Sequence, residues 1–156
     1  LHSFDPSLPL AADLKAASLQ SVVLELRFAK DYPISPPFVR VIRPRFLPFL
    51  SGGGGHVTAG GALCMELLTN SGWSAASSIE SVLLQVRMAI SSTDPSPARL
   101  DPGQRKGQVK EYGVGEAIDA YIRACRAHGW EVPRDFEREN HSQWSLAGST
   151  TKKELN

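Results

Sequence analysis

Residues 21–29 constrain the fold of this chain most, because apolar side chains recur there at every second position. One face of the extended segment would hold Val22, Leu24, Leu26 and Phe28, and the other Val23, Glu25 and Arg27. This period of two predicts a half-buried strand. A cluster of three prolines then forces a connecting loop, and residues 38–43 read as a second strand.

A cysteine follows a glycine-rich stretch further along the chain. Residues 51–55 are one serine and four glycines, which predicts a flexible loop, and residues 62–67 read as a third strand. Its two faces would differ, with Leu63, Met65 and Leu67 on one and Cys64 and Glu66 on the other. An unpaired core cysteine would lie with the leucines. Cys64 is therefore expected to be accessible and Glu66 solvated, although the pattern alone leaves reactive and structural thiols equally open.

Two helices are expected after the cysteine. Ser77 and Glu80 form a capping box, followed by an apolar stripe at helical spacing: Ile79, Val82, Leu83, Val86 and Ile90. The Asp94–Pro97 segment ends this helix. A second helix spans about Gly115 to His128, and Gly129 is its expected stop. Its apolar face would carry Ile118, Tyr121, Ile122 and Cys125, which makes Cys125 a core thiol.

The order strand–strand–strand–helix–helix predicts an α+β domain, an antiparallel β-meander packed against α-helices. Residues 1–15 carry turn signals and no long periodic run, so no element is expected there. Residues 1–134 are expected to form one domain, which suits the length of the chain. Residues 135–156 are polar and aperiodic and are expected to form a mobile tail.

Composition argues against several classes of partner. The net charge is +1, and no basic patch with interleaved aromatic residues is present, so nucleic acid is not an expected partner. No apolar run approaches the roughly 18 residues of a membrane span. With no secretory signal visible, the two cysteines are expected to remain thiols in a reducing compartment.

The motifs around the cysteine resemble a known family. Tyr32-Pro33-Ile34-Ser35-Pro36-Pro37, a strand, a loop, Gly61-Ala62-Leu63-Cys64, Trp73-Ser74 and a helix resemble the core of the ubiquitin-conjugating enzymes, over about Leu19 to Pro97. The sequences of residues 60–69 and 72–82 are similar to the divergent Q-type branch of that family, and we expect a fungal-like relative. Some fungal members of that branch are fused to an ADP-ribosyltransferase domain, but nothing in these residues indicates such a domain. That family's domain begins with an amphipathic helix and a strand. This chain opens about where that strand should end, so we expect a fragment without the leading helix.

The resemblance implies a specific chemistry. Cys64 would accept ubiquitin from the activating enzyme as a thioester and pass it to a lysine or a ubiquitin ligase. Exchange of sulfur for sulfur needs only thiolate attack, and the thioester stays activated towards an amine. No metal or organic cofactor is implied. The expected partners are ubiquitin, the activating enzyme and a ligase, in the cytoplasm, the nucleus or both.

The family's His-Pro-Asn motif is missing here. Its asparagine, eight residues before the cysteine, is assigned to oxyanion stabilisation or to shaping the loop, and His56 occupies that position. An imidazole N–H can donate to a developing oxyanion, as an amide does. The alternatives are that backbone N–H groups of the glycines do this work, or that His56 is an ordinary exposed loop residue.

Other site residues are carried by the same resemblance. Family members often have an acidic residue near position 99 that orients and deprotonates the lysine; Arg99 stands there, so Asp101 or Asp94 would have to substitute. The ligase-contacting loops match Ile34, Ser74 and Ala75, and Trp73 is expected to be structural.

Two rival functions stay open at this stage. A non-catalytic ubiquitin-binding or scaffold variant of the same fold would explain the missing motif, although such variants typically lack the cysteine. A papain-like cysteine hydrolase would need a histidine placed to activate the thiol.

Overall fold

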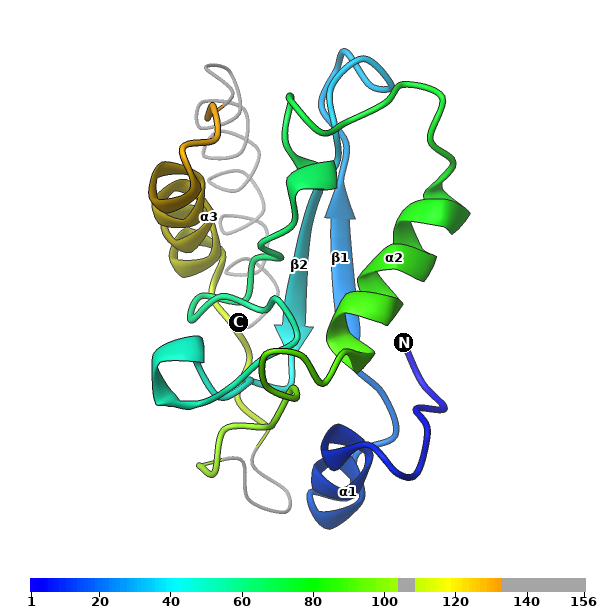
Figure 1. The fold of residues 1–156 in the computed structure, drawn as a ribbon, viewed down its shortest axis with the longest axis vertical. Helices are drawn as coiled ribbons and strands as arrows, with labels where there is room; N and C mark the ends of the chain where they lie inside the picture. Colours follow the sequence, from blue (N-terminus) through cyan, green and yellow to red (C-terminus); the bar gives the residue numbers. More distant parts are fainter. Residues whose placement is uncertain (104–108, 133–156) are drawn as a thin grey trace, which may run out of the picture.

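The computed structural model describes residues 1–103 and 109–132, and within them three α-helices flank a two-stranded antiparallel sheet (Figure 1). The elements in chain order are α1 (Pro9–Ala16), β1 (Val23–Arg27), β2 (Phe38–Arg43), α2 (Ile79–Ser91) and α3 (Val114–His128). Two short 3₁₀ turns, Phe49–Ser51 and Glu66–Leu68, lie between β2 and α2. The expected α+β class is confirmed.

The strand pair follows the sequence pattern closely. β2 has the predicted bounds, and the register pairs Leu24 with Val41 and Leu26 with Val39. Both leucines pack against the main core, as the alternation requires. Phe28 lies beyond the end of β1 and is 44% exposed, so the apolar face stops before it.

The predicted third strand over residues 62–67 was wrong. Only its start pairs with β2: the Leu63 N–H donates to the Val39 carbonyl at 3.1 Å, and Arg40 and Ala62 form an isolated bridge. The next amide, that of Cys64, turns away and donates to the His56 carbonyl at 2.8 Å. The chain then enters the 3₁₀ turn Glu66–Leu68, so the expected meander has two strands among the described residues.

A helix precedes the sheet where we expected only turns. Pro9 opens α1, a position where its missing N–H costs nothing. Leu10 and Leu14, one turn apart, are the buried residues of α1 and join the main core. Eight residues hold too few apolar repeats to stand out as a helical period, which is why the pattern missed α1.

The two later helices were predicted with small errors. The N-cap of α2 is Ser78, whose hydroxyl accepts from the Ser81 N–H at 3.1 Å, and not the predicted Ser77. α3 ends as expected at Gly129, which adopts φ +70°, a left-handed conformation that glycine tolerates best.

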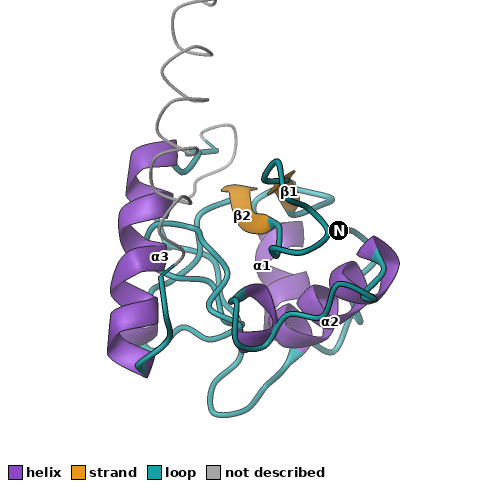
Figure 2. Cartoon of the chain, turned by 90° about the horizontal axis from the view of Figure 1, so that it is seen from above, coloured by secondary structure: helices purple, strands orange, loops and turns teal. Residues whose placement is uncertain are grey.

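Two hydrophobic clusters hold these elements together. The larger one lies between the sheet and the helices α1 and α2, and its members include Val22, Val41 and Val86. The smaller one joins α3 to Phe38 of β2 and to Ala62. Figure 2 shows α3 and α2 on opposite sides of the strand pair. Cys125 is fully buried in this second cluster, which confirms it as a core thiol.

The predicted tail, 135–156, and the predicted domain end at residue 134 lie outside the described residues. Within the described part, no helix has the length and apolar character of a membrane span.

Candidate active site

Residues 56–64, which we call the cysteine turn, form a tight hairpin that carries Cys64 at its end. Val57 bridges Leu63, and the Thr58 N–H donates to the Ala62 carbonyl at 2.9 Å. His56 and Cys64 bind each other twice: the Cys64 N–H donates to the His56 carbonyl at 2.8 Å, and His56 Nδ1 lies 3.2 Å from the Cys64 carbonyl oxygen. The structure therefore brings together His56 and Cys64, two of the residues that the sequence proposed for the site.

His56 adopts a left-handed backbone conformation with φ +58°. Few residues other than glycine tolerate this region, and asparagine and histidine are among those enriched there. Three of the four glycines before it, residues 53–55, are packed against neighbouring atoms, contrary to the expected flexible loop, and Gly52 is exposed. A methyl group on Gly54 would lie 1.8 Å from the Ser96 carbonyl oxygen, and the Ser96 hydroxyl donates to the Gly53 carbonyl at 3.1 Å. Segment 94–98 thus braces the entry to the cysteine turn.

Cys64 occupies a half-buried position at the end of the cysteine turn. Its neighbour Leu63 is fully buried, and Met65 and Leu67 pack on the main core, so the predicted division of faces is confirmed even though no strand forms. Burial raises the pKa of the Cys64 thiol above its ordinary value, and the neighbouring Cys125 adds to this rise. Glu66 is exposed, as expected.

The hydrogen-bond partner of His56 selects the tautomer of its neutral ring. A carbonyl oxygen can only accept, so Nδ1 carries the proton, and in the neutral ring Nε2 then has only a lone pair. The imidazole is engaged with the backbone of Cys64 and not with its sulfur. This geometry supports neither a papain-like thiol–imidazole pair nor oxyanion donation from the neutral ring.

Asp101 is tied to a different part of the chain. Its N–H donates to the Arg45 carbonyl at 3.0 Å, just beyond β2, and its Oδ1 accepts from the Gly103 N–H at 2.8 Å. The Asp94 N–H is bound by the Ser92 hydroxyl at the end of α2. Among the described residues, therefore, the structure joins neither aspartate to the cysteine turn by a hydrogen bond.

Arg99 is held by a residue that the sequence did not reveal. Its guanidinium makes two bonds to the Asp13 carboxylate, at 2.7 and 2.9 Å, and the Leu100 N–H donates to the same carboxylate at 3.0 Å. Asp13 lies on α1, 86 positions away. No periodic signal links residues at such separation, so only the recognition of α1 would have suggested a partner.

The loops expected to contact a ligase lie side by side at the top of Figure 1. Trp73 Nε1 donates to the Pro33 carbonyl at 2.8 Å, which ties the loop after β1 to the loop before α2. Ile34 is 76% exposed on the first loop, and Ser74 and Ala75 are exposed on the second. Trp73 itself packs against the main core, as a structural residue would.

Comparison with known proteins gives a consistent family. Residues 20–109 match the family model described as "Ubiquitin-conjugating enzyme". A human protein named as similar to the Q-type conjugating enzymes is 32% identical over 133 residues, which cover 85% of this chain and 78% of that protein. A Drosophila melanogaster protein named in the same way is 32% identical over 136 residues, covering 85% of this chain and 41% of that protein. Human ubiquitin-conjugating enzyme E2 Q1 is 38% identical over 112 residues, covering 72% of this chain and 24% of that protein.

The chain thus spans less than half the length of two of these three relatives. The three are animal proteins, and the expected likeness to fungal members stays a prediction. The match of the family model over more than half of the chain agrees with the Tyr-Pro-x-x-Pro-Pro, cysteine and Trp-Ser motifs and with the α+β fold around them. The chain belongs to the ubiquitin-conjugating enzyme family and resembles its divergent Q-type branch.

Proposed function

We propose that Cys64 accepts ubiquitin from the activating enzyme as a thioester and transfers it to a lysine or to a ligase. The observation that carries this proposal is the cysteine turn. It holds a free, half-buried cysteine by its backbone, with Leu63 in the core, in a chain that belongs to the conjugating family. Cys125, the second free cysteine, is fully buried and offers no comparable access.

The chemistry balances without a cofactor. Cys64 sulfur attacks the ubiquitin thioester on the activating enzyme, a new C–S bond forms, and the departing thiolate takes up the proton that Cys64 loses. In the second step an amine nitrogen attacks the same carbonyl. The C–S bond to Cys64 breaks, and the released thiolate takes up the proton from the amine.

His56 has a positioning role in this proposal. Its ring and its carbonyl group both bind the backbone of Cys64, so His56 fixes the position of the backbone that carries the sulfur. A donor to the oxyanion would then come from a backbone N–H group or from the protonated imidazole. Arg99 stands where the family often has an acidic residue, so Asp101, or else Asp94, would have to act in the amine step. The bond from the Gly103 N–H to Asp101 supports a turn-stabilising role for Asp101 as well.

The surface around Ile34, Ser74 and Ala75 is the proposed ligase contact. Ile34 projects an apolar side chain into solvent from a loop that Trp73 anchors, and such an exposed, well-anchored apolar residue suits a protein interface. Ubiquitin, the activating enzyme and a ligase are the proposed partners, which would meet this chain in the cytoplasm or the nucleus.

A non-catalytic ubiquitin-binding role is the second candidate. Two observations favour it: the His-Pro-Asn motif is missing, and burial raises the pKa of the Cys64 thiol, which keeps it protonated near neutral pH. A single experiment separates the two candidates, because only the catalytic one forms a covalent adduct.

The test is incubation of the complete protein with activating enzyme, ATP and ubiquitin, followed by a non-reducing gel. We expect a thiol-sensitive adduct that Cys64→Ala abolishes and the matched variant Cys125→Ala retains. An adduct that persists in Cys64→Ala would rule out the assignment. No adduct in any form would favour the non-catalytic role.

A further inference from the structure

α3 contacts the cysteine segment on both sides of Cys64. Before the cysteine, a methyl group on Gly60 would lie 2.1 Å from the Glu116 carbonyl oxygen and 2.7 Å from Ala120 Cβ, so the turn rests directly on the first turns of α3. After the cysteine, the buried Tyr121 hydroxyl donates to the Leu68 carbonyl at 3.1 Å. Residues 60–68 are thereby fixed to one rigid element at two points.

Tyr112, just before α3, packs on the tightest point of the cysteine turn. Gly61 has φ +91°, and a methyl group there would lie 2.6 Å from Cγ and Cδ2 of the Tyr112 ring. On its other side, the Gly61 carbonyl accepts from the Val41 N–H of β2 at 2.8 Å. Gly61 is thus confined between a strand and an aromatic ring, three residues before Cys64.

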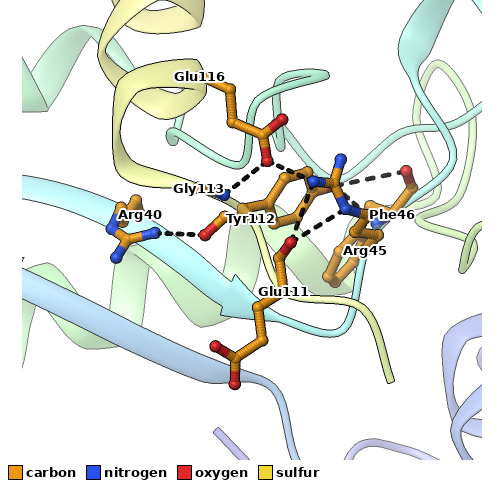
Figure 3. Close-up of polar contacts among 7 residues, drawn as sticks. All are labelled: Arg40, Arg45, Phe46, Glu111, Tyr112, Gly113 and Glu116. Carbon is orange, nitrogen blue, oxygen red and sulfur yellow. Dashed lines mark hydrogen bonds and ion pairs between the residues drawn. The ribbon is translucent and has the colours of Figure 1, made fainter. Parts of the chain in front are cut away.

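A polar network fixes the Tyr112 ring (Figure 3). The Phe46 N–H donates to the Tyr112 hydroxyl at 2.7 Å, the Arg45 guanidinium lies 4.6 Å from the ring centroid, and Arg40 Nη1 donates to the Tyr112 carbonyl at 3.0 Å. Arg45 also binds the Glu111 carbonyl and the Glu116 carboxylate, which in turn accepts from the Gly113 N–H. Tyr112 is 4% exposed, so the network leaves its ring little freedom to move.

We propose that Tyr112 and Tyr121 are positioning residues for Cys64, which hold the cysteine turn at the geometry that ubiquitin transfer needs. The inference rests on the proposed function. Neither tyrosine reaches the reacting atoms; each acts through the backbone, Tyr112 through Gly61 and Tyr121 through Leu68. Small displacements matter here, because a shift of about 1 Å at the reacting atoms can slow a reaction by about 10²-fold.

The principal test compares Tyr112→Leu with a destabilised control. The control is Leu14→Ala, which removes a buried side chain from the main core beside α1, away from the second cluster. Both variants are assayed at a temperature where circular dichroism shows each to be folded. We expect discharge of the ubiquitin thioester to free lysine to slow about 10- to 100-fold in Tyr112→Leu and to stay within about twofold in Leu14→Ala. Tyr112→Phe keeps the ring and should recover most of the rate.

A second readout does not depend on catalysis. In Tyr112→Leu, hydrogen exchange at the Gly61 and Cys64 amides should accelerate at least about tenfold more than in Leu14→Ala, because only the first variant frees the turn. Should Tyr112→Leu fail to fold, Tyr121→Phe removes the hydroxyl that binds Leu68 and should slow discharge several-fold. Equal discharge and equal exchange in the tyrosine variants and the control would overturn the proposal. If the unmodified protein forms no thioester, the proposed function fails, and with it the role of the tyrosines in ubiquitin transfer. Hydrogen exchange then decides only whether the tyrosines hold the cysteine turn.

Discussion

At the scale of single residues, the site pairs a poorly ionised thiol with a strained histidine. Burial raises the pKa of Cys64 and keeps most of it as thiol near neutral pH, so in the proposed thioester exchange the proton would have to leave as the sulfur attacks. In the proposed function the same property would matter after loading. A thiol of higher pKa is a poorer leaving group, so the proposed thioester on Cys64 would react more slowly with water and with an amine alike.

The ionisation of Cys64 can be measured directly. Because burial raises its pKa, alkylation by iodoacetamide at neutral pH should be slower than for a reference cysteine peptide, and its midpoint should lie at higher pH. Peptide-level mass spectrometry across a pH series from neutral to alkaline separates Cys64 from Cys125, which is buried and should not react in the folded protein. A midpoint for Cys64 at or below that of the reference peptide would contradict this expectation.

His56 offers a matched pair of substitutions. Asparagine tolerates the left-handed φ of position 56 and has an amide N–H that can bind the Cys64 carbonyl, so His56→Asn should discharge to lysine within about twofold of the unchanged protein. His56→Ala loses that bond and is strained at the same φ. We expect slower discharge, by about tenfold, with nearly normal thioester formation. Single-turnover assays measure both steps, and a loss of about 10²- to 10³-fold in both variants would instead assign the imidazole to the oxyanion.

At the scale of elements, the most accurate predictions were for the helix and the strand that end at a proline or a glycine. β2 lies between Pro37 and Pro44, and α3 ends at Gly129; both were placed almost to the residue. Apolar and other residues alternate equally well over segment 62–67, but this segment does not form a strand. Alternation does not determine which carbonyl group each backbone N–H binds, and the Cys64 N–H donates to the His56 carbonyl and not to β2.

The cap of α2 shows a similar ambiguity, which stability measurements can resolve. Two adjacent serines fit an N-cap, and the structure uses Ser78, whose hydroxyl accepts from the Ser81 N–H. Ser78→Ala should reduce the free energy of unfolding by about 1 kcal/mol, because an N–H at the start of the helix loses its partner. Ser77→Ala is the control and should change it by less than about 0.5 kcal/mol. If urea melts show a larger loss of stability in Ser77→Ala than in Ser78→Ala, the predicted N-cap at Ser77 would be correct.

At the scale of the whole molecule, the contacts that close the fold join distant parts of the sequence. The Tyr112 network reaches from β2 to the start of α3, and Asp13 on α1 holds segment 99–100. Sequence patterns identified most of the elements and the candidate cysteine because these are local signals. They could not identify these pairings, because the local sequence around Asp13 or Arg99 contains no signal of a contact between residues 86 positions apart.

The Asp13–Arg99 contact predicts how stability depends on pH. Burial alone would raise the pKa of the Asp13 carboxyl, but hydrogen bonds from Arg99 and from the Leu100 N–H, with the Arg99 charge, lower it below its ordinary value. A carboxyl whose folded-state pKa is lowered stabilises the fold at pH values above the unfolded pKa, which is about 4. It loses that contribution as the pH falls through the folded pKa.

The variant Asp13→Asn should therefore be less stable than the unchanged protein at neutral pH, by about 1 kcal/mol, since Arg99 is half exposed and solvent weakens the pair. The gap between the two proteins should narrow steadily as the pH falls from about 5 towards about 2, because the unchanged protein loses the charged contact that the variant already lacks. Urea melts at several pH values measure the gap. Glu80→Gln, an exposed change at the start of α2, serves as the control. A gap that stays constant down to a pH of about 3 would show that Asp13 stabilises the fold by shape and hydrogen bonding alone, without its charge.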